Sequence, residues 1–227
     1  APSGQGGGAD TMTYDYSGTL SGALTADGEE KTSDGETVAA TAADQNAALA
    51  ENGGTLTITD GTLTKAGDDT DGDNCNFYGI NSILLSVGDS SKLYVSGSKL
   101  SASSAGSNGV FATDGGTAYV YNSSITTTAD NSRGLDATYG GTVVADSIDI
   151  STQGSHCAAL ATDRGGGYIS VTNSTLATAG SGSPLLYSTG DIEVDDVTGT
   201  AAGSQIAGME GLNTILIRNS SLTSTIT

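Results

Sequence analysis

The densest group of carboxylates in the sequence lies in the short stretch GDDTDGDNCN, residues 67–76. Asp69, Asp71 and Asp73 occupy alternate positions, and Gly72 permits a tight turn between the last two. Three carboxylates turned toward one point suit Ca²⁺, which prefers six to eight oxygen ligands. The stretch lacks the twelfth-position glutamate of an EF-hand loop. It predicts a calcium site, with a solvated acidic loop as the alternative.

Three tyrosines in two neighbouring segments, Tyr94, Tyr119 and Tyr121, could contact a sugar chain. Alternation of apolar and polar residues turns all three side chains outward, and Tyr94 and Tyr119 fall at matching positions of a repeat. Aromatic rings cover the apolar faces of sugars while their hydroxyls form hydrogen bonds at the rim. We therefore predict a carbohydrate-binding platform here. The alternative is packing between neighbouring strands that stabilises the sheet.

A column of polar residues follows an Ala-Thr step that recurs along the chain. Its members and their neighbours are Asp114, Arg133, Asp136, Tyr139, Asp163 and Arg164. A polysaccharide lyase would use such residues, with calcium on the aspartates and an arginine that removes a proton beside a uronate carboxylate. The sequence does not concentrate them into an evident cleft, so we expect exposed ion pairs in turns. No catalytic residue is assigned.

The single histidine, His156, precedes Cys157, one of two cysteines. A catalytic Cys-His pair needs a fixed orientation, which adjacency in the chain does not supply. Cys75 lies about three repeats away, a separation of about 14 Å at ~4.8 Å per stacked strand. That distance exceeds the reach of a disulfide, so we expect two separate, buried thiols.

Threonines also recur at outward positions near the end of each repeat. They are Thr64, Thr126, Thr128, Thr198, Thr200, Thr223 and Thr225. A flat face of threonines could order water and bind ice. Asp149 and Ala177 interrupt the series, however, and threonine is an ordinary solvent-facing residue of strands.

These residues sit in a repeat of about two dozen residues, which predicts a solenoid. Its signatures are GGTLTITDGTL, GGTAYVYNSSI and GGGYISVTNSTL, each an alternating strand, a bend at Asp or Asn, and a further apolar residue. We predict an all-β, right-handed parallel β-helix with three short strands per coil and about seven coils. Residues 1–44 are expected to form an N-terminal extension and cap, and residues 45–227 the β-helix, which we expect to continue beyond the last residue.

Apolar columns define the expected core. The middle strand of each coil sends inward the pairs Leu56/Ile58, Leu93/Val95, Ala118/Val120, Val143/Ala145, Ile169/Val171, Ile192/Val194 and Ile215/Ile217. The third strand contributes Leu63, Leu100, Ile125, Ile148, Leu176, Val197 and Leu222. At the bends, Asn122, Asn173 and Asn219 are expected in left-handed conformations, with side chains that bond nearby backbone groups.

Composition narrows the partners. The net charge is −19 with only seven basic residues, so nucleic acid is an improbable partner because phosphate binding needs a basic surface. No stretch approaches the roughly 20 apolar residues of a membrane span. An open last coil could stack on another chain, which makes end-to-end self-association a further expectation.

The coils from Gln45 onward resemble pectate-lyase-like β-helices and, more narrowly, the calcium-containing, polysaccharide-binding β-helix proteins of clostridial and related bacterial cell surfaces. This resemblance implies secretion or a cell-surface location, polysaccharide or cell-surface glycan as the partner, and structural calcium. The expected function is a non-catalytic polysaccharide-binding or adhesin-type module. A calcium-dependent polysaccharide lyase and a filament-forming or ice-binding solenoid are the alternatives.

Overall fold

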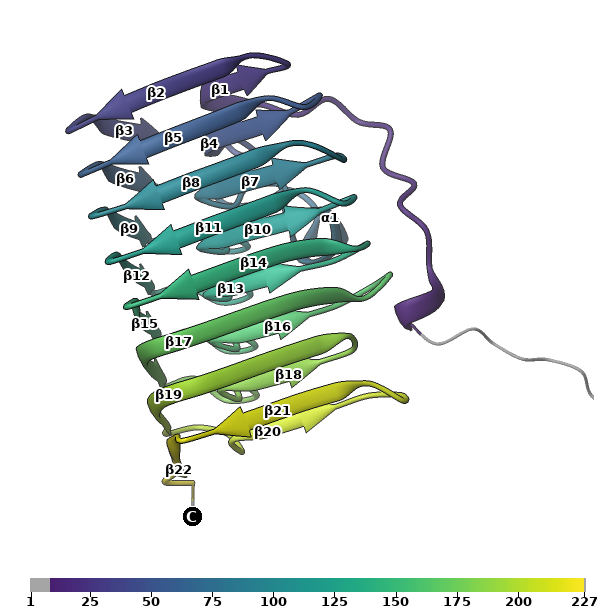
Figure 1. Ribbon diagram of the computed structural model, residues 1–227, viewed down its shortest axis with the longest axis vertical. Helices are drawn as coiled ribbons and strands as arrows, with labels where there is room; N and C mark the ends of the chain where they lie inside the picture. Colours follow the sequence, from purple (N-terminus) through teal and green to yellow (C-terminus); the bar gives the residue numbers. More distant parts are fainter. Residues whose placement is uncertain (1–8, 227) are drawn as a thin grey trace, which may run out of the picture.

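The protein is a parallel β-solenoid of about eight turns in the computed structural model, which describes residues 9–226 (Figure 1). Strands of successive coils pair in parallel along the whole stack. The predicted all-β solenoid is therefore confirmed, and about eight turns is compatible with the expectation of about seven coils. Right-handed winding stays a prediction.

Two sheets run the length of the solenoid. Sheet A gathers the first strand of each coil: β1 (Gly22–Asp27), β4 (Asn46–Glu51), β7 (Leu84–Val87), β10 (Val110–Thr113), β13 (Leu135–Ala137), β16 (Leu160–Thr162), β18 (Leu186–Ser188) and β20 (Ala207–Met209). The second strands belong to sheet B: β2 (Glu30–Asp34), β5 (Thr55–Thr59), β8 (Lys92–Ser96), β11 (Thr117–Tyr121), β14 (Gly141–Asp146) and β21 (Thr214–Arg218). Its third strands are β3 (Thr37–Ala40), β6 (Thr62–Lys65), β9 (Lys99–Ala102), β12 (Ser124–Thr127), β15 (Asp149–Thr152) and β22 (Ser221–Ser224). In two coils the second and third strands join into β17 (Gly167–Thr178) and β19 (Asp191–Ala201).

The stack begins earlier than the sequence indicates. Strands β1, β2 and β3 pair with β4, β5 and β6, so residues 22–40 form a complete coil within the region expected to be an extension and cap. The apolar pattern of the repeat does not reveal this coil, because Lys31 pairs with Leu56 and so takes a position that is apolar in later coils. Its ammonium group donates a hydrogen bond to the carbonyl of Thr25. A lysine is tolerated there because a terminal coil has a neighbour on one side only.

The core consists of the predicted apolar columns, with two corrections. Leu56, Leu93, Ala118, Val143, Ile169 and Ile192 stack in register and are buried, together with their partners two residues on. In the third-strand column, Ile150 pairs with Ile125, and Gly199 pairs with Leu176. Ile148 and Val197, assigned to that column from the sequence, are buried at the preceding bend instead. In the last coil, Ile215 is partly buried and Ile217 is 43% exposed.

The bends between the second and third strands contain asparagines in left-handed backbone conformations. Asn122, Asn173 and Asn219 have positive φ angles, as predicted. The amide groups of Asn173 and Asn219 donate to the carboxylates of Asp146 and Asp195 one coil earlier, rather than to the backbone. These side chains are exposed, and their hydrogen bonds link each bend to the coil before it.

A ladder of hydrogen bonds runs through the turns that join the third strand of each coil to the first strand of the next. The backbone N–H of Ser107 donates to Ser132 Oγ, that of Ser132 to Cys157 Sγ, and that of Cys157 to Ser183 Oγ. Cys157 therefore fills a serine position of a structural ladder. Cys75 and Cys157 are separate, buried free thiols.

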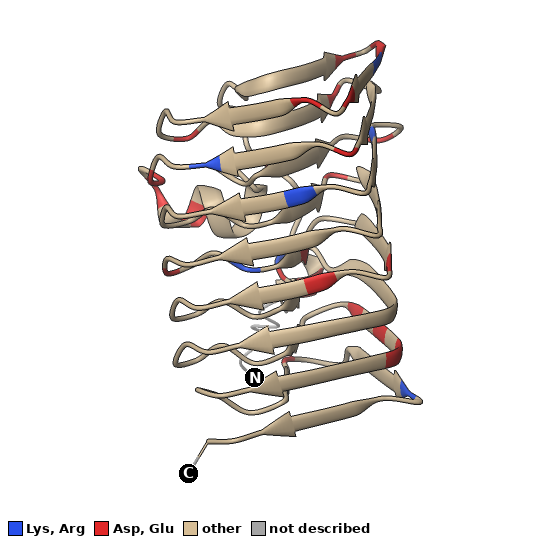
Figure 2. Ribbon diagram, turned by 90° about the vertical axis from the view of Figure 1, so that its left-hand side faces the viewer, with Lys and Arg blue, Asp and Glu red and all other residues tan. Residues whose placement is uncertain are grey.

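One helix and one extended segment cover part of the outer face of sheet A. Helix α1 (Gly72–Tyr78) lies in the insertion between β6 and β7, and the N-terminal segment, with the 3-10 turn η1 (Ala9–Thr11), runs beside the sheet (Figure 1). Tyr14 contacts the rings of Tyr78 and Tyr139 edge-on. Acidic residues cluster in the turns, whereas the strands carry few charges (Figure 2). Among residues 9–226, no helix has the length and apolar character needed to cross a bilayer.

Candidate functional site

The outward row of sheet A changes character halfway along the solenoid. In register, it runs through Leu49, Leu85, Phe111, Asp136, Ala161 and Tyr187. The first three side chains form an apolar cluster under the N-terminal segment, together with Val87, Tyr14 and Leu20. Beyond the edge of that cluster the row continues with a carboxylate, a small residue and an aromatic ring. This succession places a polar hollow beside a covered apolar face.

Asp136 is joined there by Arg133 and Asp163. The Arg133 Nη1 atom lies 2.8 Å from Asp136 Oδ2 and 3.2 Å from Asp163 Oδ2, so a single guanidinium nitrogen bridges two carboxylates. The Asp136 side chain is fully buried, whereas 14% of the Arg133 side chain is exposed. Arginine thus closes over Asp136 and presents its remaining edge to solvent.

Burial and pairing set the charges of this trio. Burial raises the pKa of Asp136 to about 7, although the adjacent guanidinium favours its charged form. Burial also raises the pKa of Asp163, again against the pull of Arg133. Burial by itself lowers the pKa of Arg133, but the two carboxylates outweigh it and leave that pKa above its ordinary value. Arg133 is therefore a permanent cation, and Asp136 holds a proton near neutral pH for part of the time.

Helix α1 and the Asn108 amide fix the position of Arg133. Asn108 Oδ1 accepts a hydrogen bond from the backbone N–H of Arg133 at 2.8 Å, and its Nδ2 donates to the carbonyl of Cys75 in α1 at 3.0 Å. Thr138 donates to the carbonyl of Phe77 in the same helix at 2.8 Å. Backbone carbonyls of α1 accept both of these side-chain hydrogen bonds. The insertion that contains α1 can therefore support the site, because it extends along the sheet to coils beyond its own.

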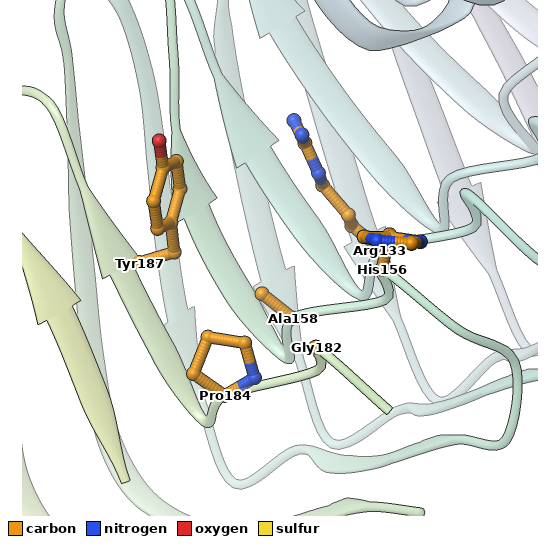
Figure 3. Close-up of a pocket in the computed structure, with 6 residues that line it drawn as sticks. All are labelled: Arg133, His156, Ala158, Gly182, Pro184 and Tyr187. Carbon is orange, nitrogen blue, oxygen red and sulfur yellow. The ribbon is translucent and has the colours of Figure 1, made fainter. Parts of the chain in front are cut away.

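A pocket of about 260 Å³ opens beside Arg133. It is lined by Arg133, His156, Ala158, Gly182, Pro184 and Tyr187 (Figure 3). The guanidinium group and the Tyr187 hydroxyl point to the same end of the pocket (Figure 3). A Cβ atom on Gly182 would meet the His156 ring at 3.3 Å, so the glycine leaves space for that ring.

Tyr187 completes the pocket on the side facing β20. Burial and a hydrogen bond to Glu210 raise the pKa of its phenol above the ordinary value. The hydroxyl therefore stays protonated, which leaves an apolar ring face beside a neutral polar tip. Planar rings with a polar edge are common at sites that bind amphipathic ligands.

The three aspartates predicted to bind calcium have separate structural roles. Asp71 is the N-cap of α1 and accepts hydrogen bonds from the backbone N–H groups of Asp73 and Asn74. The Asp73 carboxylate lies 4.0 Å from Arg164. The Asp69 carboxylate lies near Cys75, whose pKa is raised mainly by burial and further by Asp69, while the Cys75 thiol donates to the carbonyl of Gly72. Within residues 9–226 no group of three or more His, Cys, Asp or Glu side chains is arranged to hold a metal ion.

The predicted tyrosine platform lies on the outer face of sheet B. Tyr94 and Tyr119 are in register, and their rings stack with centroids 5.0 Å apart and planes 8° apart. Because each ring covers a face of the other, the pair shows mainly ring edges to solvent. Tyr121 is on the same face, 37% exposed and paired with Ser96. The rings therefore pack between neighbouring strands, and sugar binding by Tyr94, Tyr119 and Tyr121 stays a prediction.

The polar column of the sequence divides between two places. Arg133, Asp136 and Asp163 meet at the pocket, whereas Arg164 lies 3.6 Å above the ring of Phe77. Asp114 is at a left-handed turn and borders another hollow with Tyr14. The Cys157 thiol bonds within its ladder, and burial raises its pKa to about 11, so it forms no pair with His156.

Tyr187, which lines the pocket, and Glu210, which lies outside it but influences the Tyr187 phenol, are not predicted from the sequence. Their first strands, Leu186–Ser188 and Ala207–Met209, have only three residues and carry no alternation. Alignment of these strands on LDAT and LATD would have placed Tyr187 opposite Asp136, with Glu210 at the position of Asp163. The register of the repeat, and not the residue types, is therefore the signal that would have located these two residues.

The threonine series is broken on the third-strand face of sheet B. In register, the column reads Thr64, Ser101, Thr126, Ser151, Ala177, Thr200 and Thr223. Thr198 belongs to the neighbouring column, opposite Thr175. The face is therefore one of mixed small side chains.

Comparison of the chain with models of known protein families, with curated proteins and with solved structures gives no match.

Proposed function

We propose that this protein is a non-catalytic glycan-binding module of the cell exterior, either secreted or displayed on the surface. The observation that carries the proposal is the pocket on sheet A. It combines two planar side chains, His156 and Tyr187, with a fixed guanidinium group and a floor formed by Ala158 and Gly182. Sugar rings offer apolar faces and hydroxyl edges, and this set of groups complements both.

Three features of the pocket favour binding over the lyase alternative. Arg133 is held protonated by two carboxylates, so it is a poor acceptor for a substrate proton. Asp136 lies fully buried beneath Arg133 and does not reach the pocket surface. The Tyr187 hydroxyl, with its raised pKa and its bond to Glu210, is also a weak base.

The remaining expectations belong to the same proposal. Right-handed winding, the likeness to clostridial polysaccharide-binding β-helix proteins and a calcium ion at Asp69, Asp71 and Asp73 all stay predictions. Calcium titration of metal-stripped protein by calorimetry, beside a variant with these aspartates replaced by alanine, tests the last one. A calcium ion there would require Asp71 to exchange its capping bonds for the metal.

The test of the proposed function separates the two faces of the solenoid. We would screen immobilised glycans with the native chain, with a Tyr187→Ala variant and with a Tyr94→Ala/Tyr119→Ala variant. Retention that falls at least tenfold in the first variant and persists in the second supports the pocket. Loss in the second variant alone would assign binding to sheet B, and no retention by the native chain would refute glycan binding.

A further inference from the structure

No carboxylate lines the pocket on sheet A, but two carboxylates contact the arginine that does. Arg133 is its one cation and is already bound by Asp136 and Asp163. Glu210, outside the pocket, is a third carboxylate close enough to influence the Tyr187 phenol. The nearest further cation, Arg164, is engaged by the Phe77 ring and by Asp73. An incoming anion therefore finds its positive partner taken.

We propose that the glycan bound in this pocket is a neutral sugar chain, and that the carboxylates around Arg133 select against uronates. The inference rests on the proposed function, because it names the ligand class for the same pocket. A uronate carboxylate that approached Arg133 would lie close to Asp163, and like charges at such separation repel strongly where water is scarce.

A sugar hydroxyl meets no such barrier. Hydroxyl groups donate and accept hydrogen bonds, so one can accept from the guanidinium edge of Arg133 while it donates to Asp163. Nη1 is the Arg133 side-chain atom that bonds protein groups within residues 9–226, which leaves Nη2 and Nε for a ligand. Charge-assisted hydrogen bonds of this kind are stronger than those between neutral groups.

The overall charge of the protein acts in the same direction at longer range. A chain of net charge −19 repels polyanions at low ionic strength. Salt screens that long-range repulsion over about 8–10 Å, but it screens the contact inside the pocket much less. Discrimination that survives physiological salt therefore reports on the carboxylates that contact Arg133, Asp163 above all, and not on net charge.

The experiment uses pairs of probes in which a neutral group on each sugar, a methyl ester or a hydroxymethyl group, is replaced by a carboxylate. Oligogalacturonides in fully methyl-esterified and free-acid forms, and cello-oligosaccharides beside their 6-carboxylated forms, are titrated into the full chain by calorimetry at 150 mM salt. We expect the neutral member of each pair that binds to have at least tenfold higher affinity. An acidic member that binds equally or more tightly overturns this inference and leaves glycan binding intact. No binding by any probe, and no retention in the glycan screen, removes the proposed function and this inference together.

A charge variant locates the selectivity. Asp163→Asn keeps the size of the side chain and removes one negative charge, so the preference for neutral ligand should fall at least threefold. Asp34→Asn, a change on exposed strand β2 at one end of the solenoid, is the matched control for net charge. An equal change in both variants would show that selection comes from overall charge and would refute selection by the pocket.

Discussion

Asp136 illustrates how one residue can be shaped by its place in a repeat. It takes a row position that is apolar in earlier coils, where Leu85 and Phe111 are covered by the N-terminal segment. At Asp136 the Arg133 side chain, and not the N-terminal segment, covers the row. The carboxyl group is buried by its neighbours, with one oxygen bonded to Arg133 and the other without a hydrogen-bond partner in the described chain.

The raised pKa of Asp136 makes a prediction for stability. Its value of about 7 in the folded chain exceeds the ordinary value of 3.8, so the folded state binds the proton more tightly than the unfolded state does. The stabilisation that this group contributes is complete below about pH 4 and is lost as the pH rises toward 7. Asp136→Asn should therefore flatten the decline in unfolding free energy between pH 4 and pH 7.

Urea denaturation of the native chain and of Asp136→Asn at several pH values measures this slope. Asp146→Asn is a control of opposite sign, because hydrogen bonds from Thr172, Ser147 and Asn173 lower the pKa of Asp146. Identical pH profiles for the native chain and Asp136→Asn would show that Asp136 titrates normally.

At the scale of elements, the bends between strands carry specific polar ladders. Cys157 Sγ accepts the N–H of Ser132 in a position that serines occupy in adjacent coils. Cys157 is therefore a hydrogen-bonding side chain inside a turn.

This role predicts different costs for two substitutions of Cys157. Cys157→Ala removes the acceptor for a buried N–H and should reduce the free energy of unfolding by about 1–3 kcal/mol. Cys157→Ser restores an acceptor and should change it by less than about 1 kcal/mol. Chemical denaturation gives both values, and equal losses would show that packing of sulfur, and not the ladder, matters at this position.

Helix α1 links the acidic insertion to the site. Its N-cap is Asp71, and its Cys75 carbonyl accepts from the Asn108 side chain that holds the Arg133 backbone. Asp71→Ala should destabilise the helix by about 1 kcal/mol. Amide exchange in residues 72–78 should then accelerate and glycan affinity should fall, whereas Asp34→Ala should leave both unchanged. Unchanged exchange in the Asp71 variant would show that the cap is dispensable.

At the scale of the whole molecule, each coil contacts its two neighbours and little else. Stability in such an array is roughly a sum of coil and interface terms, so a defect in the middle divides the stack. The apolar core is thin but continuous, from Ala26 in the first coil to Ala201 in the seventh.

A charge placed in the central core tests this organisation. Val120 is fully buried in β11, so Val120→Asp should break the stack and replace one cooperative melting transition with two. Thr117→Asp puts the same charge on the outward side of the same strand, in register with Lys92 and Thr142, and should cost no more than about 0.5 kcal/mol. Circular dichroism melts distinguish them, and a single, lower transition for Val120→Asp would show that the solenoid unfolds as one unit.

The sequence by itself determined the solenoid, most inward columns and the left-handed bends at Asn122, Asn173 and Asn219. These features are local, because alternation has a period of two residues and a bend needs few neighbours. The errors at Ile148 and Val197 are shifts within one bend, where alternation stops and the strand register cannot be counted.

The tertiary structure alone decided the site. Arg133, Asp136 and Asp163 meet Tyr187 and Glu210 because stacking brings together residues from four coils, and α1 crosses two coils to hold the arginine. The same stacking turned the Tyr94 and Tyr119 rings toward each other. Residue types show which groups can bond, but the partner of each group depends on register between coils and on what covers the sheet. Both depend on contacts between residues far apart in the chain.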